Sequence, residues 1–348
     1  MKIAEHSIGT GHPCFVIAEA GVNHNGDMSL AHRLIDEAGK AGANAVKFQA
    51  FVTEEVMTPH APKANYQLQT TTGPQSQYSM VKPLELSPNQ IAGLHRHCLD
   101  RGIIFICTPY DFPSADMLEA LNVAAFKIAS TDTTNTPFLR HIAKKNRPVL
   151  LSTGMSSMTD VELAMTALAP VRDQTAILHC TSEYPMPPEE ANLRAMDTLT
   201  RAFGVPVGYS DHSPGIGVTP WAVAVGAILI EKHFTLDRAM AGPDHRASIE
   251  PTELAELVVT VRMVERALGD GIKRIMPSEA ANRQKMQKSL VLRHPVAKGQ
   301  IIASENLTCK RPATGLAPNE LETVSGRRAA RDIPADRPLS LADIDWNS

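Results

Sequence analysis

VPVGYSDHSPGIGVTPWAVAVGAILIEKH (205–233) joins two short apolar runs through a segment with a helical pattern. The two runs, 205–211 and 227–233, are continuous in apolar residues, which is typical of parallel strands that are buried on both faces. Similar runs come earlier in the chain, at 14–20, 44–50, 102–108, 124–130, 148–154 and 176–182. Eight strands that alternate with helical segments predict a (β/α)8 barrel, a TIM barrel of the α/β class.

The segments between the runs carry signals for helix ends. Residues 87–90 (SPNQ) combine a capping box with a first-turn proline, and Gly102 follows the apolar positions of that helix. We also predict a capping box at 159–162 and an amphipathic helix over 253–268 that ends at Gly269. A doubly wound sheet is the alternative fold, but the glycine-rich phosphate fingerprint is missing after the first run.

The length and the charge distribution indicate two domains. The chain has 348 residues and a net charge of −3, yet residues 285–348 hold ten Lys or Arg against seven Asp or Glu. We therefore predict a catalytic barrel over 1–283 and a basic second domain over 284–348, with 284–289 as the end of a linker. Segment 296–307 aligns loosely with 333–344, which suggests a small pseudo-symmetric β domain.

The composition is that of a globular enzyme. Hydrophobic residues make up 43% and charged residues 20% of the chain, which excludes disorder and collagen. A basic stripe, which would indicate nucleic-acid binding, is missing. The five cysteines form no C-x-x-C pair, the start lacks a secretory pattern, and no apolar run approaches the roughly 20 residues that span a bilayer. We expect a cytoplasmic protein that does not enter membranes.

Polar residues stand at the end of every predicted strand, where a barrel places its chemistry. Lys47 and Lys127 follow apolar residues, and a buried ammonium group needs an anion, so the pair predicts a bound phosphate or carboxylate. The hydroxyl groups of Ser130, Ser152 and Ser210 could complete this anion site. Cys107 and Cys180 are expected to pack as small hydrophobic residues.

His212 and His233 end the seventh and eighth runs, which are neighbours in a barrel. Two imidazole groups with nearby oxygens suit a divalent ion such as Mn²⁺, and the alternative is that each histidine is only hydrogen-bonded at the rim. Asn23 to Gly26 form a turn before a helix or a loop that faces the ligand. The long polar connection between the second and third runs is expected to lie over the active site.

Nine motifs together resemble the sialic acid synthase family, whose members form N-acetylneuraminate or legionaminate. They are EAGVNHNG (19–26), VKFQ (46–49), TPYD (108–111), KIAS (127–130), LSTGM (151–155), LHCTSEYP (178–185), GYSDHSPG (208–215), IEKHFT (230–235) and GPDHRASIEP (242–251). The last segment, with KRPATG (310–315), is similar to the antifreeze-like SAF domain, a β-clip, that follows the barrel in these enzymes. The likeness extends over nearly the whole chain.

The resemblance implies a transferase that condenses phosphoenolpyruvate with an N-acetylmannosamine-type aldehyde, giving a nine-carbon 2-keto acid and phosphate. It implies phosphoenolpyruvate contacts at Lys47, Thr108, Lys127, Ser130, Ser152, Ser182, Tyr184 and Ser210. It implies sugar contacts at Glu19, Gln49, Tyr184 and Asp244, and Arg311 arriving from the other subunit of a domain-swapped homodimer. His212 and His233 would hold Mn²⁺, with Mg²⁺ or Co²⁺ as alternatives.

Glu19, His212 and His233 are the expected catalytic residues. The proton of the water that adds to the substrate would go to Glu19 or to a metal-bound water. Ser182 stands where some members have Asn, and the loop from Tyr66 to Tyr78 does not align securely, so no sugar contact is assigned to it. The acceptor is either N-acetylmannosamine or a 6-deoxy diacetamido sugar, the precursor of legionaminate or pseudaminate.

Two other functions compete with the synthase. A Schiff-base pyruvate aldolase or lyase on the same barrel would need a single lysine with a depressed pKa, whereas this sequence has two strand-end lysines and a histidine pair. A module that binds ice or polysaccharide would account for the C-terminal segment alone. Its arginines are ill-suited to a flat apolar ice face, and the barrel would have no role.

Overall fold

The computed structural model describes residues 1–71 and 76–347, without the side chains of residues 69 and 70. The chain divides into two compact units, Met1–Gly269 and Asp270–Ser348. The predicted division at residue 284 lies inside the second unit. None of the helices in the described ranges is long and apolar enough to cross a membrane.

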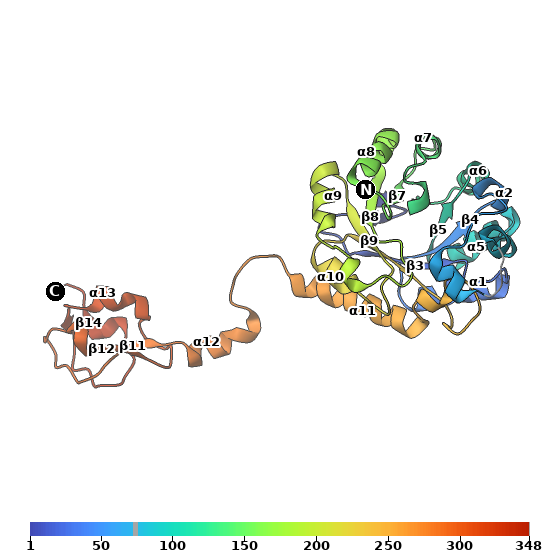
Figure 1. Cartoon of the computed structure of the whole chain (residues 1–348). Helices are drawn as coiled ribbons and strands as arrows, with labels where there is room; N and C mark the ends of the chain where they lie inside the picture. Colours follow the sequence, from blue (N-terminus) through green and yellow to red (C-terminus); the bar gives the residue numbers. More distant parts are fainter. Residues whose placement is uncertain (72–75, 348) are drawn as a thin grey trace. The chain divides into compact units, whose positions relative to one another are not determined.

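The first unit is a closed barrel of parallel strands surrounded by helices (Figure 1). The strands follow one another around the barrel in the order β10-β3-β4-β5-β6-β7-β8-β9. The strands are β3 (Phe15–Gly21), β4 (Ala45–Ala50), β5 (Ile104–Pro109), β6 (Phe126–Ile128), β7 (Val149–Ser152), β8 (Thr175–His179), β9 (Val207–Asp211) and β10 (Leu229–His233). Each predicted run overlaps one of these strands, so the predicted barrel is confirmed.

Helices follow the strands and form the outer layer of the barrel. They are α1 (Met28–Lys40), α5 (Pro88–Arg101), α6 (Phe112–Ala120), α7 (Thr136–Lys144), α8 (Met158–Ala167), α9 (Ala195–Phe203), α10 (Thr219–Ala224) and α11 (Pro251–Leu268). Ser87 and Gln90 form the predicted capping box of α5, and Gly102 ends that helix with φ 68°. The predicted box at 159–162 is wrong, because Ser157 caps α8 through Asp160.

The remaining elements of the first unit are short. They are the strands β1 (Lys2–Ile3) and β2 (His6–Ser7), the helices α2 (Thr53–Val56), α3 (Asn65–Thr70) and α4 (Gln77–Val81), and the 3-10 helices η1 (Lys82–Leu84), η2 (Ser130–Asp132), η3 (Ala169–Gln174), η4 (Pro188–Glu190) and η5 (His245–Ala247). The hairpin β1–β2 closes the barrel at the amino ends of its strands, since Ile3 and Ile8 pack with Phe15, Ile17 and Leu229 in one apolar cluster. The other end is left open for polar side chains.

The second unit is a small β domain with its own apolar core, which includes Leu290, Ile302 and Leu339. Its elements are η6 (Pro277–Glu279), α12 (Ala280–Met286), β11 (Ser289–Leu292), η7 (Ser304–Asn306), β12 (Leu307–Lys310), η8 (Pro318–Glu320), α13 (Leu321–Val324), β13 (Arg328–Ala329), η9 (Leu341–Asp343) and β14 (Ile344–Asp345).

The weak internal repeat corresponds to a structural one. Val296 and Ile333 begin the two copies and pair with each other in an antiparallel bridge. Three residues later, Gly299 and Asp336 both have positive φ, 81° and 58°. Each copy then continues through a 3-10 helix, η7 or η9, into a strand, β12 or β14. The predicted pseudo-symmetry is therefore present in the fold.

Candidate active site

The alternation of side chains along the strands brings the polar groups together. Ile17 of β3 lies in the apolar cluster inside the barrel, and Glu19, two residues further, lines a cavity at the carboxyl ends of the strands. On β10, Leu229 lies in the same cluster, while Glu231 and His233 line the cavity. Side chains two residues apart share a face of a strand. Each strand therefore contributes apolar groups to the cluster inside the barrel and polar groups to the cavity at the carboxyl ends of the strands.

The cavity has a volume of about 530 Å³. It is lined by all the predicted site residues of the barrel: Glu19, Lys47, Gln49, Thr108, Lys127, Ser130, Ser152, Ser182, Tyr184, Ser210, His212, His233 and Asp244. Arg311 lies in the second unit, where its side chain donates to the carbonyl oxygen of Met286 at 2.9 Å. The long β4–β5 connection also lines the cavity, through Tyr66 and Met80 among others, as predicted.

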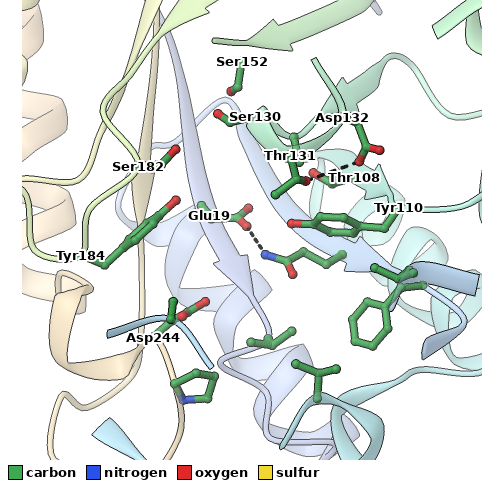
Figure 2. A pocket seen from close by; sticks show the side chains of 18 of the residues that line it. Glu19, Thr108, Tyr110, Ser130, Thr131, Asp132, Ser152, Ser182, Tyr184 and Asp244 are labelled. Carbon is green, nitrogen blue, oxygen red and sulfur yellow. Dashed lines mark hydrogen bonds between the residues drawn. The ribbon is translucent and has the colours of Figure 1, made fainter. Parts of the chain in front are cut away.

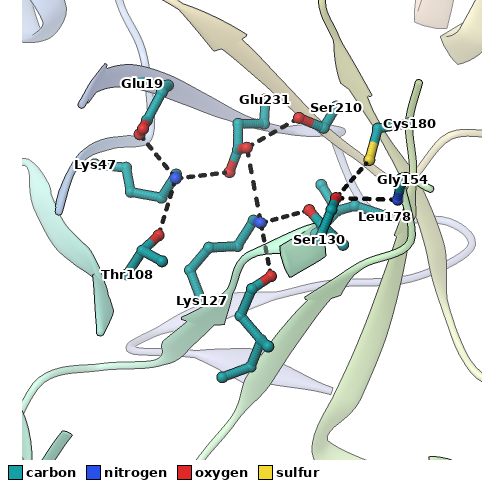
Figure 3. A network of polar contacts seen from close by, with 12 residues as sticks. Glu19, Lys47, Thr108, Lys127, Ser130, Gly154, Leu178, Cys180, Ser210 and Glu231 are labelled. Carbon is teal, nitrogen blue, oxygen red and sulfur yellow. Dashed lines mark hydrogen bonds and ion pairs between the residues drawn. The ribbon is translucent and has the colours of Figure 1, made fainter. Parts of the chain in front are cut away.

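The two lysines are buried and each has a carboxylate within reach (Figure 3). Lys47 Nζ lies 2.9 Å from Glu19 Oε2 and 3.7 Å from Glu231 Oε2, and it donates to Thr108 Oγ1 at 3.0 Å. Lys127 Nζ donates to Ser152 Oγ at 2.5 Å and lies 3.8 Å from Glu231 Oε1. The resulting network supplies two ammonium groups that can bind an anion in the cavity.

The two carboxyl groups of this network differ in acidity. Burial raises the pKa of Glu19 to about 7, although Lys47 opposes the shift. Burial acts in the same direction on Glu231, but Lys127, Lys47 and the hydroxyl of Ser210 outweigh it and hold the pKa of Glu231 at about 2. Glu231 is thus an anion near neutral pH, while Glu19 can gain or release a proton, which is the division of roles that acid–base catalysis requires.

His212 and His233 converge on the cavity, with ring centroids 5.5 Å apart. Nδ1 of His212 lies 2.6 Å from the carbonyl oxygen of Thr181, so this nitrogen carries the proton and Nε2 keeps its lone pair. Nδ1 of His233 is buried without a hydrogen-bond partner. Burial lowers the pKa of His212 to about 4 and that of His233 well below its usual value. Both rings are therefore neutral, the form that binds a metal.

A two-histidine donor set leaves other coordination positions to water or substrate. Within the described ranges, His, Cys, Asp and Glu form no group of three or more that could hold a metal ion. The residues present thus fit an ion that is held by the two histidines together with water or substrate in the cavity. A closed structural zinc site does not fit them.

Hydroxyl and amide groups surround the lysines on one side of the cavity. Ser130 Oγ accepts from the backbone N–H of Gly154 at 3.0 Å and lies 3.3 Å from Cys180 Sγ (Figure 3). Ser182 lies beside the same glycine, since a Cβ on Gly154 would overlap its hydroxyl oxygen. Cys180 thus lines the cavity in addition to being buried, whereas Cys107 is wholly buried among apolar residues.

Aromatic rings flank the other polar groups. Figure 2 shows Glu19 between Tyr184 on one side and Tyr110 on the other. The ring of Tyr184 lies 4.2 Å from that of His212 and 5.0 Å from that of Tyr66, measured between centroids. Gln49 donates to Glu19 Oε1 at 3.1 Å. Burial raises the pKa of the Asp244 carboxyl, on the same side as Tyr184, to about 6.

Some polar strand-end residues have structural roles. Asp211 lies outside the cavity, where Ser213 and Thr219 donate to its carboxylate and Lys232 lies 3.1 Å away. The side chain of His179 bonds with the carbonyl oxygen of Ala191 at 2.9 Å. The turn of residues 23–26 leads into α1, capped by Asp27, and its residues do not line the cavity.

The cavity residues that the sequence prediction of the site missed include Glu231, Tyr66, Tyr110 and Asp132. Glu231 had a usable signal, because it lies two residues before His233 on a predicted strand and so shares its face. Tyr66, Tyr110 and Asp132 belong to connections beyond the strand ends. In such connections the sequence periodicity does not define the direction in which a side chain points.

Known proteins resemble the chain over nearly its whole length. A family model described as the NeuB family matches residues 34–273, and a SAF domain model matches residues 287–345. An N,N'-diacetyllegionaminic acid synthase of Campylobacter jejuni is 46% identical, over 92% of this chain and 97% of its own. An N-acetylneuraminate-9-phosphate synthase of Homo sapiens is 38% identical, over 97% of this chain and 94% of its own.

A solved structure agrees with these relatives. The N-acetylneuraminic acid (sialic acid) synthetase of Leptospira borgpetersenii, in complex with citrate, aligns with a TM-score of 0.73 and 39% identity. The alignment covers 81% of this chain and 94% of that chain. The SAF match falls in the second unit, and the predicted combination of a barrel with an antifreeze-like domain is confirmed.

Proposed function

The chain belongs to the NeuB family, and on that basis we propose that the barrel cavity is its active site. The protein is a nonulosonic (sialic) acid synthase, which joins phosphoenolpyruvate to the aldehyde of an N-acetylmannosamine-type sugar and releases phosphate. One observation carries the assignment of the site: two buried lysines with hydroxyl groups and two neutral histidines line the same cavity.

Phosphoenolpyruvate would bind at Lys47 and Lys127. Its phosphate and carboxylate offer the negative charge that two buried ammonium groups need. Thr108 and Ser152 already bond with these lysines, and the hydroxyls of Ser130 and Ser182, with Ser210 and Tyr184, lie within the same cavity as further donors. Donors fixed in advance by burial bind the anion with little reorganisation.

His212 and His233 would hold a divalent metal, for which we propose Mn²⁺ on the basis of the neutral imidazole pair. When bound, the ion supplies Lewis-acid polarisation of the acceptor aldehyde. The tautomer of His212 is set by the Thr181 carbonyl, which orients Nε2 as a ligand atom. Gln49 and Asp244 line the cavity near Glu19 and Tyr184 and would position the sugar hydroxyl groups.

Glu19 would act during the carbon–carbon bond formation. Attack by C3 of phosphoenolpyruvate on the aldehyde carbon leaves positive charge at C2, which the nearby carboxylates of Glu19 and Glu231 can stabilise. Water then adds at C2. With a pKa of about 7, Glu19 can accept the proton of that water, which balances the proton that the alkoxide formed from the aldehyde takes up, and the tetrahedral product then expels phosphate.

We also propose that the enzyme works as a homodimer in which Arg311 reaches the partner's cavity. An exposed apolar strip on α10 and α11 supports association. Trp221 of α10 is 67% exposed and Val225, directly after α10, is 56% exposed; Val259 and Met263 are 67% and 54% exposed on α11, which packs beside α10. Exposed apolar side chains of this size on neighbouring helices are typical of protein–protein contacts.

Phosphate release tests the proposal. The wild-type protein, stripped with chelator and resupplied with Mn²⁺, is expected to release phosphate from phosphoenolpyruvate only when an N-acetylated mannosamine-type sugar is present. His212→Ala and His233→Ala are each expected to lose at least about 100-fold in kcat, because each removes one metal ligand. His12→Ala, a change at an exposed residue outside the cavity, serves as the matched control. Activity near the wild-type level in either variant would refute the metal assignment.

The Schiff-base alternative is tested with the same protein. Borohydride reduction in the presence of pyruvate would attach the substrate covalently to Lys47 or Lys127 if either lysine forms an imine. We expect no adduct in the mass spectrum. The carboxylates of Glu19 and Glu231 raise the pKa of Lys47 and hold it charged. Burial lowers the pKa of Lys127, but its ammonium group donates to Ser152 and to the carbonyl oxygen of Ile128 and lies 3.8 Å from Glu231, contacts that favour its charged form. An adduct on either lysine would favour the aldolase.

A further inference from the structure

The turn at residues 23–26 has no direct part in the proposed reaction, because its residues do not line the cavity. Asn23 and His24 are nevertheless buried. The side chains of Asn23 and Asn25 bond with residues more than 200 positions further along the chain. All these partners belong to the segment that follows β10, so the turn joins the beginning of the barrel to its last strand–helix connection.

We call residues 235–248 of this connection the Asp244 loop. Its base is the parallel bridge between Phe234 and Ile249. Asp244 lines the cavity from this loop, and Figure 2 shows it on the same side as Tyr184. The bridge fixes only the two ends of the loop, so the position of the carboxylate depends on contacts made further along the loop.

Asn25 makes two of these contacts. Its Nδ2 donates to the carbonyl oxygen of Ala241 at 2.9 Å, which sets the orientation of the amide. Oδ1 consequently faces His245 and accepts from Nε2 of that ring at 3.2 Å. The packing here is close, since a Cβ on Gly242 would lie 2.8 Å from Asn25 Oδ1 and 2.6 Å from the His245 ring. The loop is therefore fixed to the turn on both sides of Asp244.

Asn23 makes the second connection, through Ser248. Its Nδ2 donates to the carbonyl oxygen of Phe234 and to Ser248 Oγ, both at 2.9 Å. The hydroxyl of Ser248 donates in turn to the backbone carbonyl oxygen of Asp244 at 2.7 Å. Asn23 and Ser248 are both buried, and a buried polar group that loses its partner is costly. These hydrogen bonds therefore favour a single position of the loop backbone.

We infer that Asn23 and Asn25 are positioning residues, which hold the Asp244 loop so that the Asp244 carboxylate meets the acceptor sugar. The inference rests on the proposed function, because it takes Asp244 as a sugar contact and Lys47 and Lys127 as the phosphoenolpyruvate site. A displacement of about 1 Å in a substrate-positioning group can cost about 100-fold in rate. Loss of the contacts should therefore impair the use of the sugar and spare phosphoenolpyruvate.

Asn25→Gly tests the inference with little disturbance of the backbone, because Asn25 has a φ of 51°, which glycine adopts without strain. The assay measures phosphate release with Mn²⁺ and N-acetylmannosamine, or the 6-deoxy diacetamido sugar if the protein turns over only that one. We expect kcat/KM for the sugar to fall about 10-fold or more, while KM for phosphoenolpyruvate changes less than about 2-fold. Ser248→Ala, which breaks the second connection, should act in the same direction.

Asn146→Gly is the matched control, since Asn146 is exposed, has a φ of 49° and lies outside the cavity. It should keep the wild-type kinetics. Equal losses for the sugar and for phosphoenolpyruvate in Asn25→Gly, or no loss for either, would overturn the inference.

A double-mutant cycle tells positioning of Asp244 from a general structural role. Asp244→Ala is expected to lower kcat/KM for the sugar about 10-fold or more. In that background, Asn25→Gly should change kcat/KM less than about 2-fold, because the contacts no longer have a carboxylate to position. A purely structural role would leave the full loss in both backgrounds, and additive losses would therefore overturn the inference.

Hydrogen exchange tests the same contacts without turnover. Amides of residues 241–248 are expected to exchange at least about 10-fold faster in Asn25→Gly than in the wild-type protein, with the amides around Ser130 and Gly154 unchanged. Unchanged exchange in the loop would show that the turn does not hold it. No phosphate release by the wild-type protein with either sugar would instead contradict the proposed function, and the exchange data would still decide whether Asn25 fixes the loop.

Discussion

Gly154 occupies a position at which the cavity has no room for a side chain. A Cβ atom there would overlap the hydroxyl oxygen of Ser182 and lie 2.9 Å from that of Ser130. Its N–H donates to Ser130, so the backbone itself fixes one of the proposed phosphoenolpyruvate contacts. The glycine in LSTGM was part of the sequence motif, but only the folded barrel shows that its missing side chain leaves room for two serines.

Gly154→Ala is therefore expected to raise KM for phosphoenolpyruvate by about 10-fold or more, because the new methyl group displaces Ser182 and Ser130 from the anion site. KM for the sugar should change much less. Steady-state kinetics with each substrate varied in turn measures the difference. Gly39→Ala is the matched control, since a Cβ at that exposed helical position meets nothing within 4 Å. Unchanged kinetics in Gly154→Ala would show that the serines do not contact phosphoenolpyruvate.

At the scale of elements, Asp343 holds together the second copy of the repeat in the C-terminal unit. Its carboxylate accepts from the backbone N–H of Ser340 at 2.7 Å and from Arg331 and Arg337 at 2.6 and 2.5 Å. Burial opposes ionisation, but these hydrogen bonds outweigh it and lower the pKa of Asp343 to about 2. The ion pairs thus fix η9 and the start of β14 against the body of the domain.

Asp343→Asn is expected to lower the free energy of unfolding of this unit by about 1–3 kcal/mol, the usual cost of losing hydrogen bonds to a buried charged group. Because the folded pKa is depressed, the stabilisation is full above the unfolded value of about 4 and is lost as pH falls from 4 to 2. Urea unfolding followed by Trp346 fluorescence in a Trp221→Phe background measures it.

The difference between Asp343→Asn and its parent should therefore shrink between pH 4 and pH 2. The control is Asp336→Asn, which removes an exposed partner of Lys310 and should cost little. A constant difference over this pH range would mean that the charge of Asp343 does not contribute to stability.

At the scale of the whole molecule, the proposed exchange of Arg311 between subunits has a decisive test. Arg311→Ala is expected to raise KM for the sugar at least about 10-fold with little change for phosphoenolpyruvate, since a lost charge-assisted contact affects only its own ligand. Arg293→Ala, another exposed arginine of the same unit, is the control.

Mixing subunits then tells a contact in the partner's cavity from one in the same chain. Arg311→Ala keeps an intact barrel, while Lys127→Met keeps Arg311 and loses the anion site. When equal amounts of the two variants are dissociated and reassociated, half of the dimers are mixed, and each mixed dimer contains one complete site. About a quarter of all sites should therefore regain full sugar affinity. No recovery in mixed dimers would place Arg311 in the site of its own chain.

Much of the barrel site was predictable from the strands alone. Side chains two residues apart lie on the same face of a strand. The side chains of Lys47 and Lys127 were therefore expected to enter the barrel at its open end once the runs were identified as strands. The same periodicity could have identified Glu231. It could not identify Tyr66 or Asp132, because their direction depends on how the β4–β5 connection and η2 pack over the barrel mouth.

The sequence by itself determined the (β/α)8 order, the second domain with its repeat, and the polar groups at the strand ends, because these follow from local periodicity and residue type. Only the tertiary structure decided which polar ends face the cavity, since Asp211 and His179 bond elsewhere. It also decided the separate pKa values of Glu19 and Glu231. Burial and the distances between charges depend on contacts between residues far apart in the chain, which no local pattern encodes.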